Sequence, residues 1–140
     1  MRINHLIVGT DNIESSSRFY RELFDFIDDG TFVDTSSRQQ GKVLTLPTTD
    51  EHLFQLLLVP FGPEKLPNPQ HIAFEVDAIK FEKIYQNSNK LGLKIRSQPA
   101  LDSEGDAMPG HLAFAEYQYK NFYVLDPSNT NVEVMTKNQK

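Results

Sequence analysis

The sequence has no cysteine and no tryptophan among its 140 residues. Without cysteine there is no disulfide framework, no thiolate nucleophile and no cysteine-ligated zinc site, so any bound metal must use His, Asp, Glu or Gln. A surplus of basic residues is lacking too, because the net charge is −5 and the pI is near 5.3. Nucleic acid and anionic membranes are therefore not expected as partners.

Long apolar runs are also missing. No stretch approaches the roughly 20 apolar residues that cross a bilayer, and the opening MRINHLIVGTD turns polar too early for a secretory signal peptide. We therefore expect a cytoplasmic protein. The 39% hydrophobic and 24% charged residues are ordinary for a globular chain. The length fits one compact domain, or two small modules that share a core.

One pattern occurs twice in the chain, 66 residues apart. HLIVGTDNIESSSRFY, which starts at His5, aligns with HIAFEVDAIKFEKIYQ, which starts at His71, and Asp11 falls on Asp77. Each copy predicts a short strand, an aspartate that caps a helix, and an amphipathic helix, which Gly92 would end in the second copy. Strand-like segments follow each helix: GTFVDTS, GKVLTLP and HLFQLLLVP, then LKIRSQ, HLAFAEY or NFYVLD, and TNVEVMT.

Each half is therefore predicted to be a βαβββ module. FGPEKLPNPQ holds three of the eight prolines and has the composition of a linker. We expect one domain over residues 1–140, with module one at 1–61, a linker at 62–69 and module two at 70–135. The predicted class is α+β: a curved, mainly antiparallel sheet with helices on its outer face.

Strand alternation places four polar side chains on one face of this sheet. If each strand packs its richer apolar set on the helices, the side chains that face away include His5, Gln55, His71 and Glu133. All four lie in the first or last strand of a module, so we expect equivalent positions that converge where the sheet curves. Two imidazoles, a carboxylate and an amide oxygen suit Zn, Ni, Fe or Mn, with positions left open for water or a small-molecule substrate.

Each of these residues also has an ordinary explanation when taken singly. A strand histidine is usually a hydrogen-bonded surface or core residue, and a strand glutamate is usually solvated. Glu133 is notable because valines flank it, and a buried carboxylate needs a partner, water or a metal. Glu75, two residues after His71 on the same predicted face, is a second candidate base.

The chain resembles the vicinal oxygen chelate superfamily, which includes glyoxalase I, extradiol dioxygenases, fosfomycin-resistance transferases and bleomycin-binding proteins. INHLIVGTDNIESSSRFYRELFDF is similar to the family's first strand and helix, PQHIAFEVD to the start of its second module, and FYVLDPSNTNVEVM to its closing Asp-Pro hairpin. The likeness spans residues 3 to 135. It implies paired βαβββ modules that form a cup around a divalent metal.

The resemblance also implies roles for particular residues. His5, His71 and Glu133 match the usual ligands, and Gln55 stands where bacterial glyoxalase I has a second Glu ligand. In small members two chains commonly build the cup together, which implies a homodimer. Glyoxalases of the family carry a glutathione-gripping Arg where this chain has Gly9, and an Asn where it has Val59. Both differences weaken the case for a glutathione substrate, and Gly9 is expected to leave room for something bulkier.

The extradiol signature is matched only in part. Tyr123 and the Asp-Pro pair that follows it fit the tail of the signature, whereas His111 lies farther upstream than the signature allows and Asn129 replaces a Gly. Module two is also longer, with 62 residues from His71 to Glu133 against 50 from His5 to Gln55. The extra residues fall in SQPALDSEGDAMPGHLAFAEYQYK, which is expected either to cover the cup as a lid or to form a plain surface excursion.

Three functions remain open on this basis. The favoured one is a divalent-metal-dependent, glyoxalase-like lyase or isomerase acting on a small oxygen-chelating substrate, in which Glu133 is the base. The second is an Fe(II) extradiol dioxygenase, in which Tyr123 and His111 assist the reaction. The third is a metal-free protein of the bleomycin-resistance type that binds a drug or metabolite.

Overall fold

The computed structural model describes residues 3–33, 38–47, 53–61, 70–96, 110–111 and 119–137. It divides into two compact units, Met1–Leu66 (unit 1) and Pro67–Lys140 (unit 2). The linker predicted at 62–69 lies outside the described residues. Among the residues described, no helix is long and apolar enough to cross a membrane.

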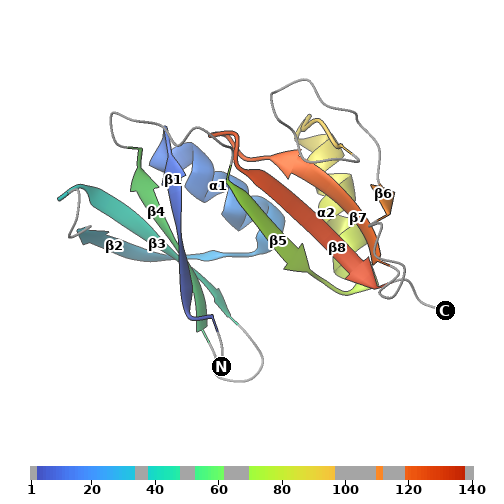
Figure 1. Ribbon diagram of the computed structural model, residues 1–140, viewed down its shortest axis with the longest axis horizontal. Helices are drawn as coiled ribbons and strands as arrows, with labels where there is room; N and C mark the ends of the chain where they lie inside the picture. Colours follow the sequence, from blue (N-terminus) through green and yellow to red (C-terminus); the bar gives the residue numbers. More distant parts are fainter. Residues whose placement is uncertain are drawn as a thin grey trace. The chain divides into compact units, whose positions relative to one another are not determined.

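Unit 1 is a βαβββ module (Figure 1). Its elements are β1 (His5–Thr10), α1 (Ile13–Phe24), β2 (Ile27–Val33), β3 (Gln40–Pro47) and β4 (Leu53–Pro60). The sheet order is β1-β4-β3-β2, in which β1 and β4 are parallel and the other two pairs are antiparallel. The first and last strands of the module therefore lie side by side at one edge of the sheet.

One face of this sheet packs on α1. The core consists of aromatic and aliphatic side chains from the helix and from alternate strand positions: Val8, Phe19, Tyr20, Leu23, Phe24, Phe26, Leu44, Leu56 and Leu58. The opposite face carries the residues between them, such as Ile7, which is 58% exposed. The alternation therefore places His5 and Gln55 on the face away from the helix, as predicted.

The start of α1 differs from the prediction by one residue. Asn12, not Asp11, is the N-cap: its backbone is extended, and its side-chain oxygen accepts a hydrogen bond from the Ser15 N–H at 3.0 Å. The Thr10 hydroxyl oxygen accepts from the Asn12 N–H at 3.0 Å, which holds the chain at this turn. The Asp11 cap was therefore wrong, because the carboxylate precedes the position from which the first helical N–H groups can be reached.

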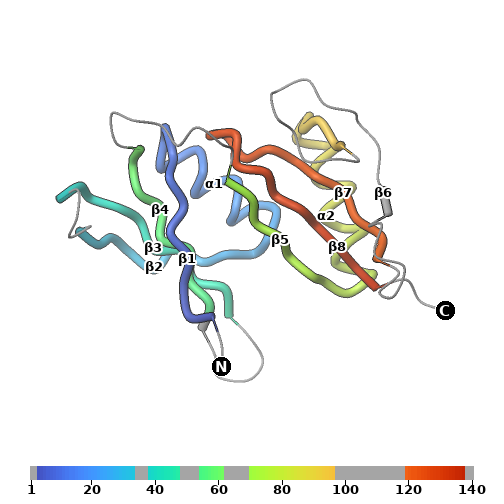
Figure 2. Tube along the Cα trace, viewed as in Figure 1, coloured from blue at the N-terminus to red at the C-terminus, as the bar shows by residue number. Residues whose placement is uncertain are grey.

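Unit 2 repeats the module. Its elements are β5 (His71–Glu75), α2 (Ala78–Lys90), β6 (Gly110–His111), β7 (Tyr119–Leu125) and β8 (Asn131–Lys137). The sheet order is β5-β8-β7-β6, with β5 and β8 parallel. In Figure 2 the chain of unit 2 can be followed from β5 through α2 to β8, which lies beside β5 as β4 lies beside β1 in unit 1.

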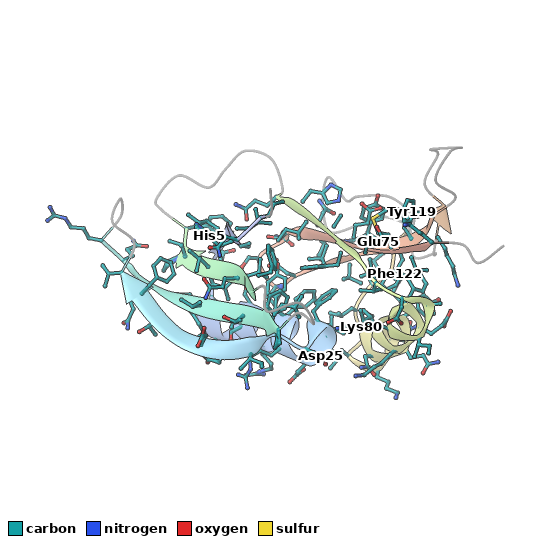
Figure 3. The ribbon with its side chains drawn as sticks, turned by 90° about the horizontal axis from the view of Figure 1, so that it is seen from below. His5, Asp25, Glu75, Lys80, Tyr119 and Phe122 are labelled. Atoms are coloured by element: carbon teal, nitrogen blue, oxygen red, sulfur yellow. The ribbon has the colours of Figure 1, made fainter. Side chains whose placement is uncertain are left out.

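The predicted limits of α2 are confirmed. The Asp77 carboxylate accepts from the Lys80 N–H at 2.7 Å at the N-terminus. The helix ends at Lys90, and Gly92 follows with φ of +70°, a left-handed conformation that suits glycine. Phe122 of β7 points toward α2 (Figure 3), where its ring meets that of Phe81 edge-on at 5.1 Å.

Among the strand candidates of unit 2, NFYVLD forms most of β7 and TNVEVMT most of β8. The strand expected at LKIRSQ is reduced, in its described part, to an isolated bridge between Arg96 and Tyr123. Most of HLAFAEY lies outside the described residues. The α+β class and the paired βαβββ modules are confirmed. The described strands form two four-stranded mixed sheets, each with a helix on one face.

Candidate metal site

The face of unit 1 away from α1 carries a polar row that crosses three strands. His5 in β1 is the register partner of Gln55 in β4, and Gln55 is the register partner of Thr45 in β3. Their side chains share a face because partners across a ladder point the same way. His5 is exposed (Figure 3), and its Nδ1 lies 2.9 Å from the Asn4 side-chain oxygen. Unit 1 thus brings together the two ligand candidates predicted in it.

A chain of hydrogen bonds holds the amide of Gln55. Its Nε2 donates to the Thr45 hydroxyl oxygen at 3.3 Å. The Thr45 hydroxyl in turn donates to Asp29 Oδ2 at 2.8 Å. Thr45 is only 7% exposed, so both bonds are partly shielded from competing water. Neither Asp29 nor Thr45 was singled out from the sequence.

Glu133 is the centre of the polar cluster in unit 2. It lies in β8 and is only 5% exposed. Its Oε2 is 3.2 Å from His71 Nε2, and its Oε1 accepts from Asn121 Nδ2 at 2.7 Å. The partner that a buried acid between two valines requires is thus present. Unit 2 brings together the two ligand candidates predicted in it.

Tyr123 faces Glu133 directly across the β7–β8 ladder. Burial, the nearby Glu133 charge and a hydrogen bond with that carboxylate raise the pKa of Tyr123 to about 12. Its phenol oxygen also accepts from Asn121 Nδ2 at 3.4 Å, and its ring meets that of His71 at 5.8 Å between centroids. Tyr123 is therefore a neutral hydrogen-bond donor beside the acid at any physiological pH.

Asn121 was missed by the sequence reasoning. It is 2% exposed, and in the described part of the chain its Oδ1 is a buried acceptor with no hydrogen-bond partner. Because a carboxylate only accepts, the Asn121 atom that faces Glu133 must be the NH₂ group, which leaves Oδ1 unused. Strand alternation could have identified Asn121, because it stands two residues before Tyr123 and therefore lies on the same face of the sheet.

The two halves are not equivalent in register, contrary to the prediction. His5 pairs with Gln55, but His71 pairs with Asn131, two residues before Glu133. The backbone agrees: Gln55 N–H donates to the carbonyl before His5, and Asn131 N–H donates to the carbonyl before His71. Asn131 is thus the structural counterpart of Gln55. Glu133 meets His71 diagonally, which a long carboxylate side chain allows.

Glu75 makes its contacts at the surface of unit 2. It is exposed, and it accepts from the Tyr119 hydroxyl at 3.2 Å, a pair labelled in Figure 3. Its other oxygen is 3.6 Å from Lys137 Nζ. These two contacts engage the carboxylate of the second base candidate, and neither partner belongs to the cluster at Glu133.

The room expected at Gly9 is already occupied. A Cβ atom at Gly9 would lie 2.7 Å from Cδ1 of Phe61 and closer still to its Cε1. The aromatic ring of Phe61 therefore covers Gly9 on the face that carries His5. The expectation of space for a bulkier ligand was wrong at this position, because an aromatic side chain of the same chain fills it.

The donor atoms suit a divalent metal, although they are divided between the units. An imidazole nitrogen and a carboxylate oxygen 3.2 Å apart are the kinds of donor that Zn, Ni, Mn and Fe accept. The unused Asn121 oxygen is a further acceptor beside them. Within the described ranges, no group of three or more His, Cys, Asp or Glu side chains is assembled to hold a metal.

The family follows from a sequence comparison. A model of the Glyoxalase/Bleomycin resistance protein/Dioxygenase superfamily matches residues 2–134. The chain belongs to this superfamily. Among curated proteins, none matches it.

Solved structures with the same superfamily fold are similar to this chain at low identity. Oxidase ChaP-H2 has a TM-score of 0.73 and 20% identity, over 99% of this chain and 94% of the other. A possible glyoxalase from Bacillus cereus has a TM-score of 0.61 and 21% identity, over 96% and 98%. The fosfomycin resistance protein FosX from Mesorhizobium loti has a TM-score of 0.57 and 19% identity, over 95% and 89%. At this identity they show the fold.

Proposed function

We propose that this superfamily member is a divalent-metal-dependent, glyoxalase-like lyase or isomerase that acts on a small substrate with neighbouring oxygen atoms. The supporting observation is the buried Glu133 carboxylate, which meets His71 Nε2 at 3.2 Å and is braced by Asn121. A carboxylate placed for structure alone would be costly at this depth, and sites that tolerate the cost are commonly functional.

The proposed metal ligands are His71 and Glu133 from unit 2, with His5 and Gln55 from unit 1. When bound, the metal would act as a Lewis acid on adjacent substrate oxygens. Asn121 occupies Oε1 of Glu133, so Oε2 remains the oxygen on the side of His71. Asn121 can thus hold Oε1 in place while Oε2 is the oxygen proposed to bind the metal or to take a proton from the substrate.

Glu133 is the proposed base, which takes a proton from a substrate carbon next to a carbonyl and returns it to the neighbouring carbon. Tyr123 donates its single hydroxyl hydrogen to Glu133 in the free protein, and it is proposed to turn that hydrogen toward the negative charge on substrate oxygen once Glu133 has taken up the proton. It can do so because its raised pKa keeps the phenol protonated. Glu75 is a weaker candidate for proton transfer, since Tyr119 and Lys137 already hold its carboxylate.

The substrate is proposed to be uncharged near unit 1. Gly9 supplies no cation there, and the Phe61 ring covers it. The neighbouring row on the same face is apolar, because Ile7 and Val43 flank Leu57. An anionic glutathione adduct would find no charged partner at Gly9 or in the row Ile7, Leu57 and Val43, whereas a flat or aliphatic group would fit against these described residues.

Metal binding is the first test. Purified protein should be stabilised by one of Ni, Zn, Mn or Fe, by about 2.7 kcal/mol when the metal is at 100 times its dissociation constant. His71→Ala should abolish that stabilisation, while Lys90→Ala, at an exposed position in the last turn of α2, should keep it. If no metal changes the unfolding temperature, the metal-free binding protein becomes the better description. If a metal does stabilise the protein, activity is sought in the metal-loaded form by screening thiol–aldehyde adducts and other vicinal carbonyl compounds.

A second candidate, an Fe(II) extradiol-type dioxygenase, is favoured by the position of Tyr123 against Glu133, since both match the extradiol signature. Oxygen consumption with catechols under Fe(II) separates it from the isomerase. The side chain of His111, its other proposed participant, lies outside the described residues.

We propose further that the protein is a homodimer whose subunits share ligands, so that His5 of one chain serves with His71 of the other. Mixing inactive His5→Ala and His71→Ala variants tests this. If ligands are shared, mixed dimers contain one site with all four ligands, and metal binding returns in part. If each chain builds its own site, mixing restores nothing.

A further inference from the structure

We infer that Asp29 and Thr45 are positioning residues that fix the orientation of the Gln55 amide, so that unit 1 presents a neutral carbonyl oxygen beside His5. The inference rests on the proposed metal function for its consequence. The orientation itself is a property of unit 1 alone. Neither positioning residue is a ligand candidate, and both act through Gln55.

The direction of the hydrogen bonds follows from what each group can donate. An ionised Asp29 carboxylate only accepts, so the 2.8 Å contact uses the single hydroxyl hydrogen of Thr45. The Thr45 oxygen is then left with lone pairs, and the atom of Gln55 that lies 3.3 Å away must be a donor. That atom is Nε2, and Oε1 therefore lies on the other branch of the amide.

The same two hydrogen bonds, from Gln55 to Thr45 and from Thr45 to Asp29, explain why an amide suits position 55 better than an acid. A carboxylate at position 55 would also need a hydrogen from Thr45, which has only one and gives it to Asp29. Two acids would then compete for one donor, with a like-charge contact as the result. The fold of unit 1 thus favours a neutral side chain here.

The irregularity of β2 helps to place Asp29. Ile27 is the register partner of Thr45, and the register of β2 against β3 shifts between Asp28 and Thr31. An irregularity of this kind redirects the side chains within it. Asp29 lies inside the shifted segment and reaches Thr45 from there.

His5 shows a matching arrangement on the neighbouring strand. Its Nδ1 lies 2.9 Å from Asn4 Oδ1. With Nδ1–H donating to that oxygen, Nε2 keeps its lone pair, which is the form of imidazole that binds a metal. In this arrangement unit 1 would offer one imidazole nitrogen and one amide oxygen on adjacent strands.

Nuclear magnetic resonance of metal-free protein tests the orientation directly. The side-chain NH₂ of Gln55 should show slowed exchange with water, and its resonance should move in Thr45→Val, which keeps the shape of Thr45 but has no hydroxyl. Thr45→Ser should restore the wild-type resonance, because serine retains the hydroxyl. An NH₂ group that exchanges freely, or does not respond to Thr45→Val, would overturn the inference.

Metal titration then tests the consequence. Thr45→Val should weaken metal binding by about 10- to 100-fold, the usual effect of removing a group that orients a ligand, and Thr45→Ser should stay near wild type. In a Gln55→Ala background, Thr45→Val should add nothing, since there is no amide left to orient. An equal loss in that background would show that Thr45 acts by another route and would overturn the positioning role.

The two tests separate the inference from the proposed function. If wild type binds no metal, the proposed function fails, while the Gln55 resonance still decides whether the hydrogen bonds of Thr45 orient the amide. If wild type binds metal and the resonance shows no dependence on Thr45, the function stands and the inference falls.

Discussion

Units 1 and 2 have the same topology but hold their site side chains by hydrogen bonds of opposite polarity. In unit 2, donors surround an acid: Asn121 and Tyr123 both donate to Glu133. In unit 1, an acceptor holds an amide: the Thr45 oxygen receives the Gln55 NH₂ group, because Asp29 takes the Thr45 hydrogen.

The difference teaches where the charge of the proposed centre resides. Unit 2 contributes a buried carboxylate, whereas the ligand candidates of unit 1 are an exposed imidazole and an amide. In unit 2, hydrogen-bond donors on β7 stabilise the buried Glu133 carboxylate. In unit 1, the Asp29 carboxylate disfavours a second acid at position 55, because it already takes the Thr45 hydrogen. A common backbone can thus carry a charged and a neutral half through changes in the adjacent strands alone.

The largest expected effect is loss of the donor that braces the acid. Asn121→Leu leaves the buried Glu133 carboxylate without its 2.7 Å bond and should lower the free energy of unfolding by about 2–3 kcal/mol, as for hydrogen bonds to charged groups. Urea denaturation measures it. In Glu133→Gln, the same substitution should cost less, since no charge is left to satisfy. Equal costs in both backgrounds would contradict the comparison.

Alkaline pH should weaken unit 2 through Tyr123. Its pKa is raised from 10 in the unfolded chain to about 12 in the fold, so the stabilisation of the neutral phenol is complete below pH 10 and is lost as pH rises toward 12. The loss should be roughly 2.7 kcal/mol, because the shift is about two pKa units and each unit corresponds to about 1.4 kcal/mol. Tyr123→Phe should remove this part of the pH dependence. Tyrosinate absorbance, followed in both proteins, would reveal an ordinary pKa if the prediction is wrong.

Filling the glycine in unit 1 should have a somewhat smaller effect. Gly9→Ala places a methyl group against the Phe61 ring, and overpacking of this kind should cost about 1–2 kcal/mol. Phe61→Leu should recover much of that loss in thermal unfolding, because the ring is the obstacle. A double variant no more stable than Gly9→Ala would mean that the backbone, not Phe61, limits the space.

The smallest expected effect concerns the charge of unit 1. Gln55→Glu sets two carboxylates against the one Thr45 hydrogen and should cost about 1 kcal/mol at neutral pH. Asp29→Asn should relieve that cost, since the Asn amide can take either direction. Denaturation at low salt measures both variants. No relief from Asp29→Asn would show that the two halves do not differ in the way described.

Periodicity was sufficient to predict the faces of the strands. Alternation alone placed His5 opposite Val8, and Glu133 opposite its flanking valines, as the structure shows. The helix pattern and Gly92 likewise predicted the end of α2. These features depend on residues close together in the chain, where local geometry decides the outcome.

Strand register could not be predicted in the same way. The match of Asn131, rather than Glu133, to Gln55 depends on which backbone groups pair across β5 and β8. The support from Asn121, Thr45 and Asp29 depends on register too, and in the last case on an irregularity in β2. The pairing of distant strands is hard to predict from one sequence, because many polar residues lie on the correct face and the face alone does not select which of them meet.

The position of Phe61 has a consequence for how new specificity can arise in this scaffold. Its ring lies at the far end of β4 from Gln55, over a glycine that supports no side chain of its own. A single exchange there reshapes the surface offered to a ligand and leaves every candidate donor atom in place. Under the proposed function, selection could therefore change the choice of substrate through this one residue and keep the candidate metal ligands unchanged.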